Sequence, residues 1–481
     1  MNGYTIQSEK LNKNRVFILQ KSELEKRLDP FYYVPELVEL EKKVLTKQPK
    51  KLRDYVKGIA SGATPKTTES EKYYAEKENG IPFLRVQNLS PTGILEFDDC
   101  KYINEETHNE MLKRSQVSAG DLLVKITGVG RMAVASVAPE GFEGNINQHV
   151  CVIKTGCKEI SEQLAAFLNT DIGEKLASRR STGGTRPALD YPALLSIPIL
   201  NDSRILAITK KVIEQKKQNE AAAENLLASI DDYLLGELGI KLPEPPENTL
   251  KNRIFTTKIS SISGTRFDPR HYQQYYLDFY TNLYKSSSPK KLKQISLYIG
   301  SGSTPRAGGE DYTDELKGVP FIRITNLKDD TISLEDVLYI NRDIHENTLK
   351  RTQLQSGDLL LSMAGTIGLT VIVPDWLKEG NINQALARIV LKNGYEKRYV
   401  KEVLNSKIGK IQTDRLSRPS VQANINFDEI GSLLIPIPNF EKQKEIAEHI
   451  TGIRQQAQQL KDKTNEALKQ VSEEIEQILL G

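Results

Sequence analysis

Two polar segments carry the side chains best suited to recognising another molecule. The first reads Arg179-Arg180-Ser181-Thr182-Gly183-Gly184-Thr185-Arg186, and the second runs from Asp414 to Asn424. Arginine can form paired hydrogen bonds with guanine in the DNA major groove, whereas glutamine and asparagine form them with adenine. Serine, threonine and glycine amides can hold phosphates. These residue types suit a surface that reads nucleic acid, although an ordinary solvated loop has the same composition.

Other candidate DNA-binding residues are polar or basic side chains that stand beside strand-like or glycine-rich stretches. The polar segments themselves contribute Arg179, Arg180, Thr182, Thr185, Arg186, Arg415, Arg418, Ser420, Gln422 and Asn424. The remaining candidates are Lys66, Arg85, Gln87, Lys125, Arg131, Arg306, Arg323 and Thr325.

The sequence lacks the motifs that would give the chain its own chemistry. It has no GxxxxGK[ST] phosphate loop, no GxGxxG after a strand, and no Asp/Asn-Pro-Pro-Tyr/Phe set for methylating an amino group. Asp121 and Asp358 are acidic candidates for a hidden nuclease, but neither stands in a carboxylate–lysine cluster. The histidines and cysteines are too few and too scattered for a zinc site. We therefore expect no catalytic residue and no bound metal or cofactor.

Composition is compatible with a nucleic-acid reader but does not identify one. The chain has 481 residues, 66 Lys+Arg against 63 Asp+Glu, and a net charge of +3, so a basic surface must be concentrated on one face. No apolar run is long enough for a membrane span, and the start of the chain has no signal-peptide pattern. Cys100, Cys151 and Cys157 are expected to be buried free thiols in a reducing cytoplasm.

The chain is a tandem duplication, because the same motifs recur in the same order with a nearly constant offset. Ser61-Gly62-Ala63-Thr64-Pro65-Lys66 matches Ser301-Gly302-Ser303-Thr304-Pro305-Arg306, and Gly144-Asn145-Ile146-Asn147-Gln148 matches Gly380-Asn381-Ile382-Asn383-Gln384. Further matched pairs are Asn14–Phe17 and Asn252–Phe255, Arg27–Pro30 and Arg266–Pro269, Gly80–Arg85 and Gly318–Arg323, Tyr102–Asn104 and Tyr339–Asn341, Gly120–Leu123 and Gly357–Leu360, and Ile197–Ile199 and Ile435–Ile437.

The duplication separates two kinds of position. Residues kept in both copies build the shared scaffold or touch phosphates, and residues that differ can read different targets. Gly120-Asp121 and Asn145–Gln148 belong to the kept class, with a turn and a hydrogen-bonded strand end as their plainest interpretation. His108 and His345 are expected to be packed or capping residues. The differing class contains Arg85-Val86-Gln87 against Arg323-Ile324-Thr325, and Lys125 against Ser362.

Each copy predicts a globular α/β domain followed by a long helix. Short apolar runs predict strands at 122–126, 150–153, 359–363 and 387–391. Segments 202–235 and 441–480 lack proline and carry apolar residues at heptad-like spacing, with polar Gln215 and Asn219 interrupting the first seam. We expect the two helices to pair as an antiparallel coiled coil. The predicted domains are 1–200 and 243–438, the latter beginning with a linker at Pro243-Glu244-Pro245-Pro246, and the predicted helices are 201–242 and 439–481.

This ordered set resembles the specificity subunits of type I restriction–modification systems. The resemblance covers nearly the whole chain and rests on Ser-Gly-x-Thr-Pro-Lys/Arg, on Gly-Asp-Leu-Leu before a glycine-rich turn, and on Ile-Pro-Ile before each helix. Ser229–Leu235 resembles the family's central helix end, and Glu441–Ile446 its distal helix start. The central helix begins Asp202-Ser203-Arg204 where a glutamine is expected, so any role of Gln443 is not duplicated.

The resemblance implies a cytoplasmic, non-catalytic subunit of a phage-defence system with two target-recognition domains. It implies binding to a split site on double-stranded DNA, with one half-site per domain, and recruitment of two methyltransferase subunits and of motor-nuclease subunits. S-adenosylmethionine, ATP and Mg belong to those partners. The helices would act as a ruler between half-sites, since about 34 residues span roughly 50 Å. A DNA-recognition adaptor of another phage-defence complex and a coiled-coil scaffold remain alternatives.

Overall fold

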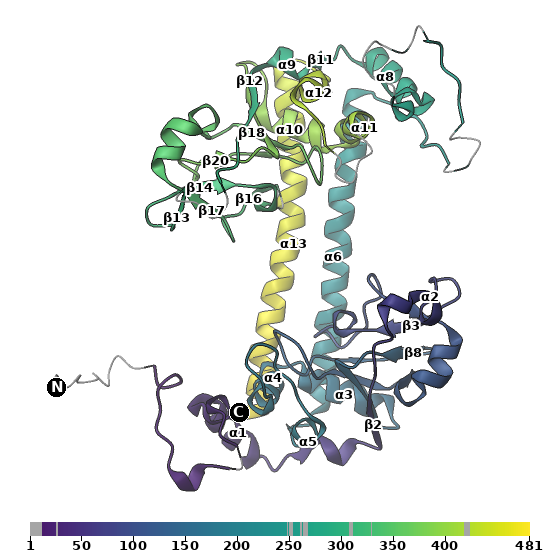
Figure 1. The fold of residues 1–481 in the computed structure, drawn as a ribbon, viewed down its shortest axis with the longest axis vertical. Helices are drawn as coiled ribbons and strands as arrows, with labels where there is room; N and C mark the ends of the chain where they lie inside the picture. The colour runs from purple at the N-terminus through teal and green to yellow at the C-terminus, as the bar shows by residue number, and fades with distance from the viewer. Residues whose placement is uncertain are drawn as a thin grey trace, which may run out of the picture. The chain divides into compact units, whose positions relative to one another are not determined.

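The contacts in a computed structural model divide the chain into two compact units, each described here by itself. Unit 1 comprises Met1–Glu220 with Lys461–Gly481, and unit 2 comprises Ala221–Leu460. Each unit holds one copy of the repeat and part of each long helix (Figure 1). The structure describes residues 12–25, 27–247, 249, 254–259, 262, 268–306, 311–328, 330–417 and 424–481.

The two long helices form close to where the sequence predicts them. Helix α6 spans Ser203–Leu238 and helix α13 spans Phe440–Leu480. Helix α6 ends in a left-handed Gly239, with a φ of 62°. The Gly239 amide donates to the Gly236 carbonyl at 3.1 Å, and the Ile240 amide to the Leu235 carbonyl at 3.0 Å. This is the Schellman arrangement, which satisfies the last carbonyls of a helix.

Within each unit the two helices contact each other and run in opposite directions. In unit 1, Asn219 Nδ2 donates to Thr464 Oγ1 at 3.0 Å. In unit 2, the Tyr233 ring stacks on His449 with centroids 4.0 Å apart, and one turn further along α6 the partner lies earlier in α13, where Lys442 Nζ is 2.5 Å from Glu237 Oε2. The polar residue predicted at the seam, Asn219, therefore pairs with a polar residue of the other helix.

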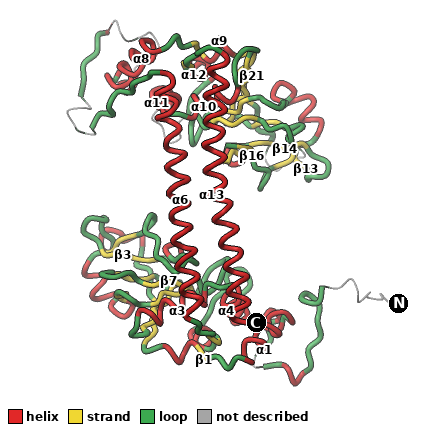
Figure 2. Tube along the Cα trace, turned by 180° about the vertical axis from the view of Figure 1, so that it is seen from behind, coloured by secondary structure: helices red, strands yellow, loops and turns green. Residues whose placement is uncertain are grey.

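Each copy contains two small four-stranded sheets (Figure 2). The first sheet has the same strand order in both copies, whereas the second shares three matching strands and has a different fourth strand in each copy. The first sheet is antiparallel in both copies. The second sheet contains one parallel pair in each copy, β3 with β8 and β14 with β20. In copy 1 the first sheet is β2 (Gly58–Ser61), β9 (Val150–Lys154), β6 (Leu122–Lys125) and β7 (Ala135–Val137), and the second is β4 (Lys101–Ile103), β3 (Ile81–Leu84), β8 (Glu143–Ile146) and β5 (Gln116–Ser118). In copy 2 they are β12 (Ser296–Ser301), β21 (Leu386–Leu391), β18 (Leu359–Ser362) and β19 (Thr370–Ile372), then β13 (Tyr312–Thr313), β17 (Leu338–Ile340), β14 (Val319–Ile322) and β20 (Asn381–Ile382).

Matching helices pack on the first sheet of each copy. The four predicted strand segments are all found as β6, β9, β18 and β21, which confirms a mixed α/β fold. Each copy also has a two-stranded sheet. It pairs β1 (Lys50–Lys51) with β10 (Pro198–Ile199) in copy 1, and β11 (Lys290–Lys291) with β22 (Leu434–Ile435) in copy 2. The helices of copy 1 are α1 (Pro35–Thr46), α2 (Ser70–Tyr73), α3 (Lys158–Leu168), α4 (Asp171–Arg180) and α5 (Tyr191–Leu195), and those of copy 2 are α8 (Gln274–Ser286), α9 (Leu292–Ile295), α10 (Lys397–Asn405), α11 (Lys407–Leu416) and α12 (Phe427–Ser432).

Each unit has its own principal core, to which the long helices contribute. In unit 1, sheet residues such as Leu122 and Ile153 pack with Phe167 of α3, and Ile205 and Ile475 join them from α6 and α13. In unit 2, Leu359 and Ile389 pack with Tyr399, Leu234 and Ile446 in the same manner. The long helices are therefore held by buried apolar surface in each unit, which is the main stabilising contribution in such cores.

Kept residues build the scaffold, as the duplication predicts. His108 is buried, with Nδ1 hydrogen-bonded to Asn145 Oδ1, and Asn145 Nδ2 donates to the Leu112 carbonyl at 2.9 Å. His345 and Asn381 repeat these contacts in copy 2. Both histidines are thus packed residues, as predicted.

The kept acidic residues and the unduplicated Gln443 are also structural. Asp121 accepts from the Ser118 amide and from Lys154 Nζ, each at 2.8 Å, and Asp358 accepts from the Gln355 amide and Arg388 Nε. Gln443 is buried, accepting from the Glu396 amide at 3.1 Å and donating to the Pro438 carbonyl at 2.9 Å.

The cysteines depart from the expected burial. All three are free thiols, but only Cys151 is buried, Cys100 is half-buried and Cys157 is exposed. Cys157 precedes α3 in a surface turn, so the prediction of burial is wrong for it. In the part of the chain that the structure describes, no helix combines the length and apolarity needed to cross a bilayer.

Candidate nucleic-acid interface

One edge of the second sheet gathers many of the predicted site residues. Strands β3 and β8 are parallel, with Phe83 paired to Asn145 and Leu84 to Ile146, so their carboxyl ends meet at this edge. The chain continues there as 85–88 after β3 and as 147–149 after β8. The loop after β2 reaches the same place, because Gly62 lies against the Ile146 carbonyl so closely that a Cβ atom would collide with it. Gly302 meets the Ile382 carbonyl in the same way in copy 2.

A row of polar side chains runs across this edge in copy 1. Thr64 Oγ1 hydrogen-bonds to Gln148 Oε1, Gln148 Nε2 lies 3.4 Å from His149 Nε2, and Arg186 Nη2 lies 3.1 Å from the same His149 nitrogen. The structure thereby joins the loop that carries Lys66 to the loop that carries Thr185 and Arg186. We call Thr64, Gln148, His149 and Arg186 the polar row.

A short hairpin presents the exposed residues of the first polar segment. The backbones of Thr182 and Ala188 hydrogen-bond in both directions at 2.8 Å, and Ala188 also bridges to Thr127. Thr182, Thr185 and Arg186 are exposed on this hairpin. Their side chains are free to approach a ligand, and their assignment as DNA-binding residues stays a prediction.

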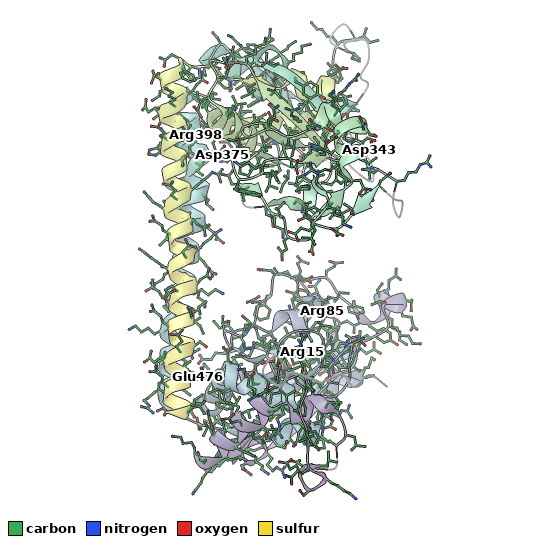
Figure 3. All side chains as sticks on the ribbon, turned by 90° about the vertical axis from the view of Figure 1, so that its left-hand side faces the viewer. Arg15, Arg85, Asp343, Asp375, Arg398 and Glu476 are labelled. Atoms are coloured by element: carbon green, nitrogen blue, oxygen red, sulfur yellow. The ribbon has the colours of Figure 1, made fainter. Side chains whose placement is uncertain are left out.

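Arg85 is held by its own loop, whereas Gln87 is exposed. Arg85, which is labelled in Figure 3, donates from Nη2 to the Asp99 carbonyl at 2.8 Å and to Asp99 Oδ2 at 3.1 Å. Gln87 Nε2 donates to Asp99 Oδ2 at 2.8 Å. The hydrogen bond from Gln87, together with the charge of Arg85, holds the pKa of Asp99 below its usual range.

Copy 2 repeats the arginine contact. Arg323 Nη2 donates to the Asp336 carbonyl at 2.9 Å, so Arg85 and Arg323 both anchor a loop. Gln87 and Thr325 are the exposed positions at which these two loops differ.

Lys125 has a structural role that the sequence comparison missed. Its side chain is buried, and Nζ donates to the Val129 and Arg131 carbonyls at 2.7 and 2.9 Å, while burial lowers its pKa. Ser362, its counterpart, hydrogen-bonds to the Thr366 carbonyl. The residues differ between copies, yet each holds the glycine-rich turn that follows its strand. We therefore leave Lys125 out of the proposed reading surface.

Arg131 is held at the edge of α4. Its Nη1 is 3.0 Å from Asp171 Oδ1, and its Nη2 hydrogen-bonds to the Asn169 carbonyl. These contacts fix the glycine-rich turn against α4, so Arg131 is partly committed to the fold.

Arg179 and Arg180 lie in the last turn of α4, not in a solvated loop. Both are buried and pair with Glu41 of α1, and Arg179 Nε donates to the Tyr32 carbonyl at 2.8 Å. Burial acts to raise the pKa of Glu41, but the hydrogen bond and charge of Arg180, with Arg179, outweigh it and hold the pKa below the usual value. These arginines fasten α4 to α1.

Arg415 of α11 is held like Arg179. Its Nε donates to the His271 carbonyl at 2.9 Å, and its guanidinium lies 4.6 Å from the Tyr280 ring centre. Its side chain is only partly exposed. Arg415 therefore fastens α11 within unit 2, and the second polar segment begins inside the last turn of α11.

The remaining candidates of copy 2 are partly visible. Thr304 Oγ1 hydrogen-bonds to Gln384 Oε1, which reproduces the start of the polar row, and Arg306 is exposed beside it. Asn424 is exposed and bridges to Ala364, as Ala188 does to Thr127. Arg418, Ser420 and Gln422 lie outside the described residues.

His149 is the residue that the sequence comparison should have found. It follows the kept Gln148, and its counterpart after Gln384 is Ala385. The signal was a difference between copies directly beside a kept motif. Burial, and then the charge of Arg186, lower the pKa of His149.

Part of the chain resembles known proteins. A family model described as the type I restriction modification DNA specificity domain matches residues 285–470. The specificity subunit of the type I restriction enzyme EcoBI from Escherichia coli is 24% identical over 176 residues. These matches make the chain similar to type I restriction–modification specificity subunits. The match covers 36% of this chain and 35%, about a third, of the length of the E. coli subunit.

Solved structures of type I systems also resemble this chain. A chain from a study of complex assembly and conformational transition of the type I R-M system is 15% identical, with a TM-score of 0.49, over 90% of this chain and 95% of that chain. The type I restriction-modification system S subunit from M. genitalium is 12% identical, with a TM-score of 0.40, over 90% and 94%. Within the described ranges, no group of three or more histidine, cysteine or acidic residues is placed to hold a metal ion.

Proposed function

We propose that this chain is the DNA-specificity subunit of a type I restriction–modification complex and binds a bipartite site on double-stranded DNA, one half per repeat. The observation that carries the proposal is the loop edge of the second sheet, which has the same framework in both copies. The Thr–Gln contact is kept at Thr64–Gln148 and Thr304–Gln384. Exposed neighbours differ, as Gln87 does from Thr325. A reader of two different half-sites needs this combination of constant frame and variable side chains.

The reading surface we propose is the exposed set at these two edges. The structural arginines Arg179, Arg180 and Arg415 are not part of it, and neither is Lys125. It comprises Lys66, Gln87, Thr182, Thr185 and Arg186 in copy 1, and Arg306, Thr325 and Asn424 in copy 2, with Arg418, Ser420 and Gln422 kept as sequence-based candidates.

Catalysis in this proposal belongs to partners. The chain recruits two methyltransferase subunits that use S-adenosylmethionine to methylate adenine, and motor-nuclease subunits that use ATP and Mg. The resemblance of residues 285–470 to the type I restriction modification DNA specificity domain supports these partners. We assign no catalytic residue to the chain, and its candidate acids Asp121 and Asp358 are each engaged by a backbone amide and a cation.

We further propose that α6 and α13 pair as an antiparallel coiled coil that sets the spacing between half-sites. The 36 residues of α6 extend about 54 Å at the usual helical rise of ~1.5 Å per residue. The contacts of Asn219 with Thr464 and of Tyr233 with His449 support the pairing register.

An insertion tests the spacing. Seven residues added after Gln215, with seven added after Leu468 in α13, lengthen the pair by about 10 Å, or roughly three base pairs. The preferred spacer should grow by that amount while both half-sites stay the same. An unchanged spacer would contradict the ruler.

Selection from a random duplex library tests the function itself. The chain is purified with its methyltransferase partner, and bound duplexes are sequenced. We expect a split, asymmetric site. A variant in which residues 181–188 are replaced by the sequence of 417–424 should change the first half-site only. Enrichment of no sequence, or of one continuous sequence, would contradict the proposal.

A further inference from the structure

His149 stands where it can control the direction of the Arg186 guanidinium. Arg186 Nη2 is 3.1 Å from His149 Nε2. A guanidinium can only donate, so His149 Nε2 must accept, and the imidazole is neutral with its proton on Nδ1. The other polar neighbour of this nitrogen is the neutral amide of Gln148, at 3.4 Å. Arg186 is the charged group that faces the imidazole.

Arg186 keeps its other hydrogen-bond donors. The side chain is exposed on the Thr182–Ala188 hairpin, while His149 is half-buried at the start of β9. The half-buried imidazole therefore holds one edge of the exposed guanidinium. The Nη1 group and the second Nη2 hydrogen remain available for a paired contact with guanine N7 and O6.

The two copies support this pairing, because they differ at both positions of the pair. Ala188 and Asn424 occupy the same place, because each bridges to the turn after the third strand of its first sheet, at Thr127 and Ala364. Counting back two residues aligns Arg186 with Gln422, and His149 aligns with Ala385. The imidazole acceptor is present in the copy that has arginine and absent in the copy that has glutamine.

We propose that His149 is a positioning residue for Arg186, which fixes its guanidinium to read a guanine in the half-site bound by copy 1. The inference rests on the proposed function. Protonation of His149 removes the acceptor and places a second positive charge beside the guanidinium, so discrimination at that base falls. Burial and the charge of Arg186 lower the pKa of His149, so the loss occurs below the usual histidine range.

The test uses the complex with the methyltransferase partner and duplexes that carry the selected site. Each base pair of both half-sites is replaced in turn, and affinities are measured by fluorescence anisotropy between pH 5.5 and 8. Discrimination is the ratio of affinities for the selected and the replaced duplex. We expect His149→Ala to lower it about fivefold to tenfold at one guanine of the first half-site and to leave the second half-site unchanged.

A conservative variant separates positioning from folding. His149→Gln retains a hydrogen-bond acceptor, so it should keep discrimination and lose the pH dependence. The double variant His149→Ala with Arg186→Ala should lose no more than Arg186→Ala alone, because the two residues act as one unit. The matched change in copy 2, Ala385→His, should leave the first half-site unchanged.

Several outcomes would overturn the inference. Equal weakening of all duplexes by His149→Ala, failure of His149→Gln to restore discrimination, or additive effects in the double variant would each do so. Absence of any selected site for the wild-type complex would instead overturn the proposed function. Specific wild-type binding that is indifferent to His149 would overturn this inference alone.

Discussion

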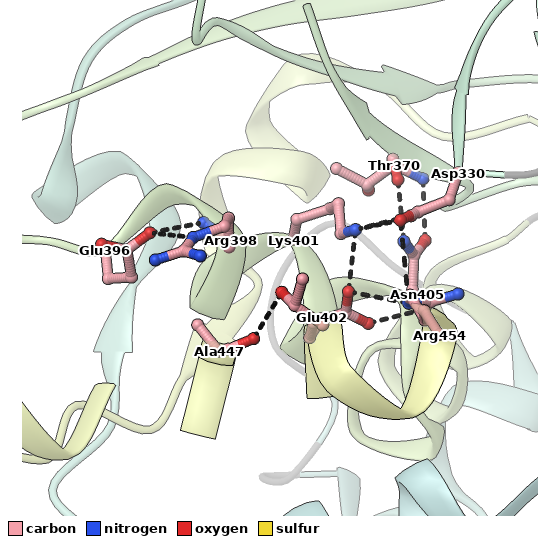
Figure 4. Close-up of polar contacts among 10 residues, drawn as sticks. Asp330, Thr370, Glu396, Arg398, Lys401, Glu402, Asn405, Ala447 and Arg454 are labelled. Atoms are coloured by element: carbon pink, nitrogen blue, oxygen red, sulfur yellow. Dashed lines mark hydrogen bonds and ion pairs between the residues drawn. The ribbon is translucent and has the colours of Figure 1, made fainter. Parts of the chain in front are cut away.

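The two copies of the repeat carry different side chains at one set of matching positions. In unit 2, the turn between β15 (Leu327–Lys328) and β16 (Thr331–Ile332) contributes Asp330 to an ionic cluster (Figure 4). Lys401 Nζ of α10 is 2.6 Å from both Asp330 oxygens and 2.8 Å from Glu402 Oε1, and Arg454 Nη2 of α13 is 2.7 Å from Glu402 Oε2. These charges join the β15–β16 hairpin, α10 and the long helix α13.

In unit 1 the matching positions carry small residues. Asn169 and Asn405 make the same backbone contacts in the two copies, which aligns Ala165 with Lys401 and Ala166 with Glu402. Gly93 and Asp330 are both left-handed residues of the matching turn. Gly93, Ala165 and Ala166 line a groove of about 620 Å³ with Leu206 and Ile213 of α6. The backbone is thus the same in both copies, while small residues of copy 1 stand where copy 2 has an ionic cluster.

Removing Glu402 should have the largest effect. Glu402→Ala leaves Lys401 and Arg454 without their shared partner, and breaking a buried pair in this way costs about 3 kcal/mol or more. The free energy of unfolding, measured in urea, should fall by that amount. Glu448→Ala, which removes an exposed carboxylate of α13, is the matched control. A loss below about 1 kcal/mol would show that the cluster does not hold unit 2.

The Glu402 carboxylate should also make the free energy of unfolding depend on pH. Burial acts to raise the pKa of Glu402, but Arg454 and Lys401 outweigh it, so its pKa lies below the ordinary 4.5. A lowered pKa contributes stability above the unfolded value, and this stability is lost as the pH falls through the folded value. The difference in stability between wild type and Glu402→Gln should therefore narrow in acid. A difference that widens below pH 4.5 would contradict this assignment.

Unit 1 relies on a different buried ionic contact, between α4 and α1. Arg180→Ala removes one of two arginines from Glu41 and should cost about 2–3 kcal/mol in the free energy of unfolding. Thr185→Ala on the neighbouring hairpin is the control. If Arg180→Ala leaves stability intact and alters half-site choice instead, Arg180 belongs to the reading surface after all.

In contrast to Arg180, Arg186 should affect DNA binding and not stability. Arg186→Ala should leave the unfolding curve unchanged and weaken binding at one half-site by about 1–3 kcal/mol. The measurement is anisotropy with duplexes altered in either half. Equal loss for every sequence would reassign Arg186 to phosphate contact.

The smallest expected effect concerns thiols of copy 1. Burial raises the pKa of Cys151 to about 12, while Cys157 is exposed, and the counterpart of Cys151 in copy 2 is Ala387. At pH 8, iodoacetamide should label Cys157 readily and Cys151 only on unfolding, so Cys151 labelling reports on the core of copy 1. Equal labelling of both thiols in the folded chain would contradict this packing.

The sequence predicted what depends on local periodicity and on the duplication. The β6, β9, β18 and β21 segments are short apolar runs, and α6 and α13 contain no proline. The kept histidines were interpreted correctly because an identical residue in both copies suits a shared scaffold.

The candidate site was harder to predict because its residues meet through long-range contacts. Arg180 and Arg186 look alike in the sequence, but Arg180 pairs with Glu41, which lies 139 residues earlier in the chain. Lys125 and Ser362 differ and yet share one structural role, which a comparison of residue types does not reveal. The role of His149 could be inferred only from the structure, in which the hairpin places Arg186 beside it.

Mapping of methylated adenines tests the central claim most directly. The chain is expressed with its methyltransferase partner in a host that lacks other adenine methylation, and the genome is sequenced for N6-methyladenine. The account predicts methylation at one bipartite, asymmetric motif with a fixed spacer, which disappears when this chain is omitted. Methylation at a continuous motif, or methylation that persists without this chain, would contradict the account.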